Sequence, residues 1–380
     1  MYKMLLCSRY LRTRFIALAS IVSVMLGVAT MIVVNSVMSG FQAETYKRLH
    51  GILSDLVIES HGLEGIQDPA VVMAQTREVL GDDIDAMTAN VHVPAMLHLK
   101  FRGQIFTKQI NLIGIDRETY ADVGDFAQYL LHPENREKLS FGLKYDGYGE
   151  RFSEAEMGTA LPGAGWPYRR ERVMLDRLYE QQRQRMEAAK APKPPVAPAS
   201  GAATANTLAQ AEPESGESLS DIQDPFAELA PDKEDIFDAA KETHMGIVLG
   251  IALASERMRN KEGEVIDFYL CRPGDDVQVT FPTSGMPPKP ASSYFTVVDL
   301  YESKMSEYDA TFAFIPIEEL QRLRGMIDPE SGIAAVSAIQ VRLKPDADLY
   351  ACREKLRERF PANIVPFHVQ SWKDMQGPLL

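Results

Sequence analysis

The side chains that could carry chemistry are spread along the sequence and do not form a complete site. His92 and His98 are spaced so that both would lie on one face of a strand, and His61 follows another predicted strand by two residues. A zinc site draws its ligands from closely spaced Cys, His and carboxylate side chains. No acid or cysteine completes such a set beside these histidines. The sequence therefore predicts no metal site.

The motifs of common catalytic and nucleotide-binding sites are also missing. The sequence contains no P-loop, no HExxH, no GxSxG and no CxxC. Its acid pairs Asp82–Asp83 and Asp275–Asp276 stand beside glycines, which is typical of solvated turns rather than of general acid–base catalysis. These patterns indicate a protein that is not an enzyme and that holds no cofactor.

The three cysteines are too few and too scattered for a disulfide framework. Cys7 precedes the apolar segment described next, whereas Cys271 and Cys352 follow it. The last two could pair only if the fold brings them together, and we expect two free thiols.

One apolar segment must position the rest of the chain. Residues Phe15–Phe41 read FIALASIVSVMLGVATMIVVNSVMSGF, and no charged residue occurs from Phe15 to Val34. At about 1.5 Å of rise per residue, those 20 residues span roughly 30 Å, the apolar thickness of a bilayer. The segment predicts a transmembrane helix over 15–41 that continues to about Leu49.

The charges around this helix predict its orientation. Residues 1–14 form a basic amphipathic lead-in with no acid, and its cations are Lys3, Arg9, Arg12 and Arg14. The positive-inside rule places this end in the cytoplasm and most of the chain outside it. The alternative is a cleaved secretory signal, but the apolar run exceeds a signal core and no clear A-x-A site closes it.

Small residues mark one side of the helix and indicate neighbours within the bilayer. A face of small side chains lets a second transmembrane helix approach closely, which a lone anchor does not need. The small residues are Ala17, Ala19, Ser20, Ser23, Gly27, Ala29 and Thr30.

The composition of the whole chain is that of a mostly soluble protein. It has 380 residues, 45% of them apolar, and a mean hydropathy of −0.17. This length is enough for one or two packed cores. A net charge of −13 argues against a nucleic-acid partner, because no dense cationic face is available for phosphates.

The pattern after the helix predicts an α+β fold built around two β-α-β units. The first consists of the strand Leu56–Glu59, the helix Pro69–Leu80 and a hairpin of Val91–Arg102 and Lys108–Asp116 around Gly103. The second consists of Ala335–Lys344, Leu349–Phe360 and Ile364–Trp372. We expect the two units to lie side by side.

The middle of the chain is predicted to be inserted between these units. Residues 120–179 mix aromatics with Gly, Pro and charges and predict a partly ordered insertion. Residues 180–242 are rich in Ala, Pro and acids and predict a disordered linker. Residues 243–333 predict a β-rich subdomain that includes the proline-rich loop Pro282–Ser293.

Three segments resemble one protein family. They are SRYLRTRFIALASIVSVMLGVATMIVVNSVMSGFQAE near the start, INLIGID at Ile110–Asp116 and FTVVDLYESKMSEYDATFAFIPIEELQRL at Phe295–Leu323. Together, V-M-S-G-F and M-S-E-Y-D are similar to motifs of the lipoprotein-releasing (LolC/LolE-type) ABC transporter permeases, within the MacB/FtsX-like superfamily. The resemblance does not extend over 120–240.

The resemblance implies a fold and a set of partners. The expected fold is one N-terminal transmembrane helix followed by a MacB-like periplasmic domain, with a porter-like subdomain (42–119 and 334–376) and the inserted β-rich subdomain. It implies a non-ATPase permease subunit of the bacterial inner membrane that works by mechanotransmission. The implied partners are an ABC ATPase subunit, a second permease subunit, membrane lipids, a lipoprotein substrate and a periplasmic carrier protein.

The resemblance also implies two sets of site residues. Val33, Val37, Met38 and Phe41 would line a cavity for lipoprotein acyl chains, or would pack against neighbouring helices. A carrier-binding hook would consist of Pro282, Gly285, Met286, Pro287, Pro288 and Pro290. Its prolines would keep it extended and reduce the entropy lost on docking. An ordinary hairpin connection is the alternative.

Other functions fit parts of the sequence. Members of the family have three further transmembrane helices, and this sequence ends at Leu380, where the second would begin. We therefore expect either a fragment or a split-gene product whose other helices come from another chain. The alternatives are a MacB-like efflux subunit, an FtsX-like cell-envelope regulator and a single-pass adaptor that binds proteins.

Overall fold

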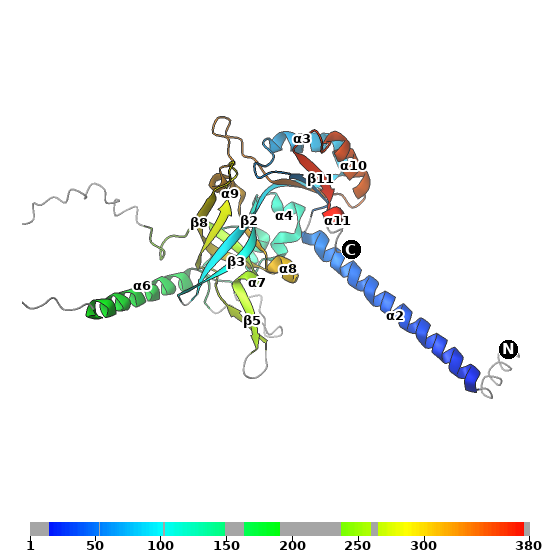
Figure 1. Cartoon of the computed structure of the whole chain (residues 1–380), viewed down its shortest axis with the longest axis horizontal. Helices are drawn as coiled ribbons and strands as arrows, with labels where there is room; N and C mark the ends of the chain where they lie inside the picture. The colour runs from blue at the N-terminus through cyan, green and yellow to red at the C-terminus, as the bar shows by residue number, and fades with distance from the viewer. Residues whose placement is uncertain are drawn as a thin grey trace, which may run out of the picture.

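A computed structural model describes residues 15–52, 54–101, 103–148, 163–190, 237–259 and 265–375. Figure 1 shows a mixed α/β domain from which the long helices α2 and α6 extend on different sides. The predicted lead-in 1–14 and the central part of the predicted linker, 191–236, lie outside the described residues.

Helix α2 is longer than a membrane requires. It runs without a break from Phe15 to Ile52, and its 38 residues extend about 57 Å at roughly 1.5 Å per residue. Within it, Ala19–Phe41 is long and apolar enough to cross a bilayer. The described side chains of this segment are exposed in the isolated chain. The helix therefore has an apolar part of membrane length and a further extension that leads to the domain.

The two predicted β-α-β units do lie side by side. They share a four-stranded antiparallel part of the sheet in the order β11-β1-β10-β2, a split β-α-β arrangement. Helices α3 and α10 contact each other, and Asp68 and Asp348 cap their N-termini. The elements are β1 (Leu56–Ser60), α3 (Pro69–Leu80), η1 (Gly81–Asp83), β2 (Ile84–Phe101), β10 (Ala338–Leu343), α10 (Leu349–Arg359), β11 (Phe367–Ser371) and α11 (Trp372–Met375).

Six of the described strands close into a barrel that shares strand β2 with this unit. The order continues as β2-β3-β9-β4-β8-β7, and β7 pairs again with the distal half of β2. Two of the six, β2 and β3, therefore come from the range that we predicted as the porter-like subdomain. The added elements are β3 (Gln104–Ile115), β4 (Gly246–Gly250), α7 (Ile251–Ala254), β7 (Asp276–Pro282), β8 (Pro290–Tyr301), α8 (Ser306–Asp309), β9 (Phe312–Pro316) and α9 (Ile317–Arg324). A separate hairpin consists of β5 (Ser255–Arg259) and β6 (Val265–Tyr269).

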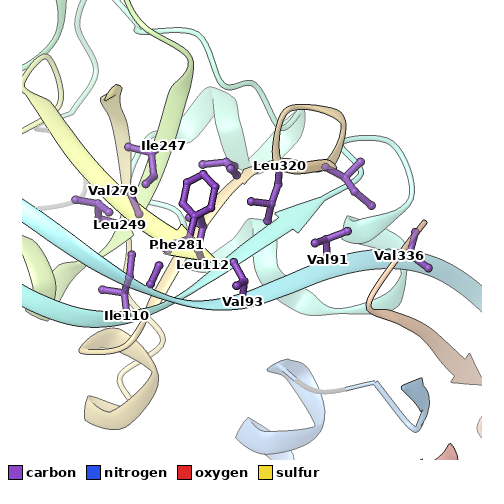
Figure 2. Close-up of a cluster of buried hydrophobic side chains, with 14 of the residues drawn as sticks. Val91, Val93, Ile110, Leu112, Ile247, Leu249, Val279, Phe281, Leu320 and Val336 are labelled. Atoms are coloured by element: carbon purple, nitrogen blue, oxygen red, sulfur yellow. The ribbon is translucent and has the colours of Figure 1, made fainter. Parts of the chain in front are cut away.

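Apolar side chains fill the barrel. Inward residues of β2, β3, β4 and β7 meet around Phe281, and Leu320 of α9 packs against them (Figure 2). A six-stranded barrel is narrow enough for its own side chains to fill, so it encloses a core and not a channel. The labelled residues are Val91, Val93, Ile110, Leu112, Ile247, Leu249, Val279, Phe281, Leu320 and Val336.

The predicted insertion forms a second core on the outer face of the barrel. Its described residues 120–148 contain α4 (Tyr120–Val123), η2 (Asp125–Tyr129) and α5 (Pro133–Glu137). Tyr120, Phe126 and Phe141 pack against Tyr301 and Phe314 of the sheet. These aromatics lacked a period in the sequence because they belong to short irregular turns and not to one regular element.

A buried carboxylate holds this segment to β8. Asp299 is completely buried and accepts hydrogen bonds from the backbone N–H groups of His132 and Leu300 and from Asn135 Nδ2, the last at 2.7 Å. Burial, only partly offset by these hydrogen bonds, raises the pKa of Asp299 to about 6. An ionised side chain is thus kept in the interior at neutral pH.

The acid pair Asp275–Asp276 is not a solvated turn, which corrects the prediction. Asp275 is 6% exposed and forms an ion pair with Arg172, while Arg169, itself 1% exposed, pairs with Asp276 at 2.8 Å. Burial raises the pKa of Asp275. Both arginines come from α6 (Gly165–Lys190), so the pair holds the start of that helix against the barrel.

Helix α6 also alters the predicted extent of the linker. Residues 180–190 of the predicted linker 180–242 are the last turns of α6. At the C-terminal end of the predicted linker, Asp238 accepts a hydrogen bond from Arg177 of α6 at 3.0 Å. The described residues 237–242 therefore lie against the helix. Between the helix and this turn lie residues 191–236, which are outside the described residues.

Asp299 makes a testable contribution to pH dependence. In the folded state the pKa is about 6, against about 4 for an unfolded aspartate, so the folded state binds more protons between these pH values. The free energy of unfolding should therefore fall from pH 4 to pH 6 and lose about 3 kcal/mol from this group. Urea unfolding of the full chain in detergent should show this trend weakened in Asp299→Asn.

A control for this trend is Asp328→Asn. Hydrogen bonds from Ser331 and from the Glu330 N–H lower the pKa of Asp328, so its contribution is present above the unfolded pKa and is lost as pH falls. The decrease between pH 4 and pH 6 should persist in this variant. An identical pH profile for wild type and Asp299→Asn would contradict the assignment.

Candidate functional site

The predicted hook is the connection of a β-hairpin in the barrel. Strands β7 and β8 pair up to Pro282 and Pro290, so the loop contains only residues 283–289. The predicted loop Pro282–Ser293 is thus shorter than expected, because residues 290–293 pair within β8. Of the predicted hook residues, Gly285, Met286, Pro287 and Pro288 form the loop, while Pro282 and Pro290 close it. The Met286–Pro287 peptide bond is cis.

The base of this loop is bound to the end of α9. The Ser284 N–H donates to the Arg324 carbonyl at 2.9 Å, and its hydroxyl donates to the Arg324 and Gly325 carbonyls at 3.0 Å each. The Thr283 N–H donates to the Lys289 carbonyl, and the Lys289 N–H donates to Thr283 Oγ1. These bonds fix the position from which the loop begins and ends.

Arg324 connects the loop base to a third segment. Its side chain is 1% exposed, and it donates from Nε to the Pro282 carbonyl at 3.3 Å and from Nη2 to the Leu63 carbonyl at 3.1 Å. Burial lowers the pKa of Arg324. The buried guanidinium thus holds together the hairpin, α9 and the turn after β1.

The tip of the loop is exposed. Residues 285–290 are all exposed, and the Met286 side chain is 81% exposed. Beneath the tip, a shallow apolar groove lies between strands β2 and β7, lined in part by Pro94, Phe281 and Pro288. A firmly held base with an exposed Met and two prolines has the form of a protein-docking element.

This loop lies on the side of the domain away from α2. Strand β1 begins at Leu56, four residues after α2 ends at Ile52, and runs to Ser60. The turn that follows β1 contains Leu63, whose carbonyl binds Arg324 at the loop base. In Figure 1, β8 and α9 lie on the side of the domain away from α2.

The predicted cavity residues form a separate set on α2. Val33, Val37 and Phe41 follow one another at four-residue spacing and share one face of the helix, with Met38 beside them. All four side chains are more than half exposed in the isolated chain, from 53% for Met38 to 68% for Phe41. The structure therefore does not bring them near the loop, and no described residue of this chain covers them.

The described residues just before β1 are firmly bonded to the sheet. Asp55 is 7% exposed, its Oδ2 accepts from the Leu343 N–H at 2.8 Å, and its carbonyl accepts from the Trp372 N–H at 3.1 Å. Ser54 is also buried. Strand β1 lies between β10 and β11. The strand that follows α2 is thus paired along both of its edges.

The structure gathers histidines that looked dispersed in the sequence. His92 Nε2 lies 3.0 Å from Glu59 Oε1, His368 Nε2 lies 4.0 Å from Glu59 Oε2, and His61 stacks on His368 at 4.8 Å between ring centroids. The hydrogen bond from His92 lowers the pKa of Glu59. Among the described residues, neither this group nor any other is arranged to hold a metal ion. Pairing of β1 with β11 and of β10 with β2 is what brings the four residues together, and no sequence signal marks it.

The two later cysteines do not meet. Cys271, just after β6, and Cys352, in α10, are both buried free thiols. Burial raises the pKa of Cys352 and of Cys271, so neither is an activated nucleophile. Cys7 lies outside the described residues.

Comparisons with known proteins give one similarity of fold. No protein-family model matches the chain, and no curated protein matches its sequence. Among solved structures, the chain is similar to the periplasmic region of MacB from Actinobacillus actinomycetemcomitans, at 12% identity over 87% of this chain and 94% of that chain, with a TM-score of 0.32. Similarity at this level does not establish a family, so the function proposed below rests on the residues of this chain.

Arg324 provides a test of the loop base. Arg324→Met would leave the Pro282 and Leu63 carbonyls without their buried donor, which should lower the free energy of unfolding by about 3 kcal/mol. The matched control is Arg322→Met, because Arg322 is exposed and, among the described residues, pairs with Glu319 across one helical turn. Its loss should cost less than about 1 kcal/mol. Equal losses in urea unfolding of the two variants would contradict the anchoring role of Arg324.

Proposed function

We propose that this chain is the membrane-anchored, non-ATPase subunit of an ABC transporter that transmits motion from α2 to its extracytoplasmic domain. Its substrate would be lipoprotein released from the inner membrane, and the loop 283–289 would pass it to a periplasmic carrier protein. The substrate and carrier come from the family resemblance of the sequence. What the structure adds is a path by which motion at the membrane could reach the loop.

The observation that carries this proposal is the short separation of α2, which ends at Ile52, from β1, which begins at Leu56. One helix of 38 residues contains the candidate span, and β1 begins at Leu56, held on both sides by neighbouring strands. An anchor that only tethers a domain needs neither a helix beyond the bilayer nor a buried connection. A transmitter of movement needs both, because a flexible link would absorb the displacement.

A series of hydrogen bonds continues from the turn after β1 to the loop. The turn after β1 binds Arg324 through Leu63, and Arg324 and Ser284 hold the base of the hairpin. On α2, the exposed stripe of Val33, Val37 and Phe41 is available to acyl chains or to neighbouring helices. The proposal thus assigns one end of the chain to lipid and substrate and the other to a soluble partner.

Co-purification tests the transporter against the adaptor. The tagged full chain, extracted from its native membrane in mild detergent, should retain an ABC ATPase and transmembrane helices beyond α2, supplied by a second subunit. Retention of these partners should require the small-residue face around Gly27. In Gly27→Val the added side chain meets nothing within 4 Å in this chain, so the change should weaken only the packing against other helices. The matched control is Met25→Val, which places the same branched side chain on the opposite side of the helix. Recovery of the chain alone under gentle extraction would favour the single-pass adaptor.

The connection before Ser54 gives a test of transmitted motion. Insertion of Gly-Ser-Gly immediately before Ser54 should leave the complex assembled but reduce lipoprotein release at least tenfold, because the flexible link would absorb the displacement. The same insertion within 191–236, outside the described fold, is the control. Undiminished release by the first variant would contradict mechanical coupling through α2.

The loop tip gives a test of carrier docking. Replacement of Met286, Pro287 and Pro288 by Gly-Ser-Gly retains Thr283, Ser284 and Lys289 and therefore the bonds of the loop base. Capture of the carrier from periplasmic extract should weaken at least tenfold, with unfolding unchanged. The same replacement at Pro329–Ser331, an exposed turn, should leave capture intact. Unchanged capture by the loop variant would show that the loop is only a hairpin connection.

A further inference from the structure

A partly open cleft lies between the split β-α-β unit and the aromatic cluster of the insertion. Its volume is about 200 Å³. The floor is one face of the sheet, to which β1, β10, β2, β3 and β9 each contribute two residues at i and i+2 spacing. The floor residues are Val57, Glu59, Ala338, Gln340, Asn90, His92, Asn111, Ile113, Phe312 and Phe314.

The walls of this cleft are aromatic. Tyr120, Phe126 and Tyr301 face it together with Phe312 and Phe314 of the floor. Phe126 stacks on Tyr301 at 5.3 Å between centroids, so the rings are held in place by one another. Aromatic faces carry negative electrostatic potential and attract cations as well as apolar groups.

The charged side chain of the cleft is a carboxylate. Glu59 is the only acid among the lining residues, and the lining contains no Lys or Arg. His92 holds the Glu59 carboxylate from one side at 3.0 Å, and its hydrogen bond lowers the pKa of Glu59, so the carboxylate is ionised at neutral pH. The cleft therefore repels anions and favours cations.

A second observation points to a bound molecule. The Asn90 side chain is 4% exposed and lines the cleft, yet its Oδ1 has no hydrogen-bond partner among the described residues. A buried acceptor without a donor costs about 1–3 kcal/mol, and such groups are rare in folded proteins. A ligand that donates an N–H group would satisfy Asn90.

We propose that this cleft binds a small organic cation, with an amine or ammonium group between Asn90 and Glu59 and an apolar or aromatic body against the ring walls. A cavity of about 150 Å³ lined by apolar side chains can hold one benzene ring, so this volume matches a single ring with a short amine arm. A polypeptide or a lipid headgroup with its chains would not fit. The inference is independent of the transport role.

The position of the cleft gives such a ligand access to the membrane helix. Phe126 belongs to η2, and η2 contacts α2. The floor includes Val57 of β1, the strand that follows α2 along the chain. A ligand in the cleft would thus contact residues of η2 and of β1, the two segments next to the end of α2.

The test is calorimetric titration of the detergent-solubilised full chain with benzylamine, with benzyl alcohol and benzoate as neutral and anionic analogues. Benzylamine should bind saturably and benzoate should not. Glu59→Gln and Asn90→Leu should each weaken benzylamine at least tenfold, and Glu59→Gln should leave any binding of benzyl alcohol unchanged. Ala338→Met, which fills the floor, should abolish binding. Ala70→Met, the same change on the exposed side of α3, should not.

Three results would overturn the proposal. They are absence of saturable benzylamine binding, equal binding by wild type and Ala338→Met, and a crystal structure grown with benzylamine in which only water contacts Asn90 Oδ1. Because Glu59→Gln is nearly isosteric and Asn90→Leu keeps the number and branching of the side-chain heavy atoms, both remain informative if Ala338→Met fails to fold.

Discussion

The structure depends on strand β2, which belongs both to the split β-α-β unit and to the barrel. It pairs with β10 up to Asn90, with β3 from Asn90 to Phe101, and with β7 near Leu97. A strand has a side-chain period of two, so one register must satisfy both parts of the sheet. A slip of one residue would move Val91, Val93 and Leu97 out of the core and place Asn90 and His92 inside it. The split β-α-β unit and the barrel are therefore one cooperative body.

The two faces of this shared strand position the loop 283–289 and the cleft, the two sites of the proposals above. The inward side chains of β2 fill the barrel, which fixes the β7–β8 hairpin and with it the loop 283–289. The opposite side chains line the cleft against the aromatic cluster. Both features are held to the same rigid sheet that receives α2 through β1. The proposed transmission of movement from α2 relies on this shared sheet.

Buried charges secure the segments that the sheet does not itself order. Asp299 holds the insertion, Arg169 holds α6, and Arg324 holds the proline loop, each through hydrogen bonds to backbone or to an opposite charge. A buried ion without such partners would cost several kcal/mol, so each one specifies a single position for its segment. These are the segments whose sequences lack a regular apolar period.

The sequence by itself determined the elements with a strong local signal. The apolar run predicts α2, the capped segment 69–80 predicts α3, and alternation with a Gly103 turn predicts the β2–β3 hairpin, because propensity and period act within a few residues. The order of these elements and the exposed proline loop also follow from the sequence. Closure of the barrel, the burial of Asp275 and the meeting of Glu59 with His61, His92 and His368 do not. They arise from pairing between strands up to roughly 300 residues apart, and only tertiary packing selects those partners.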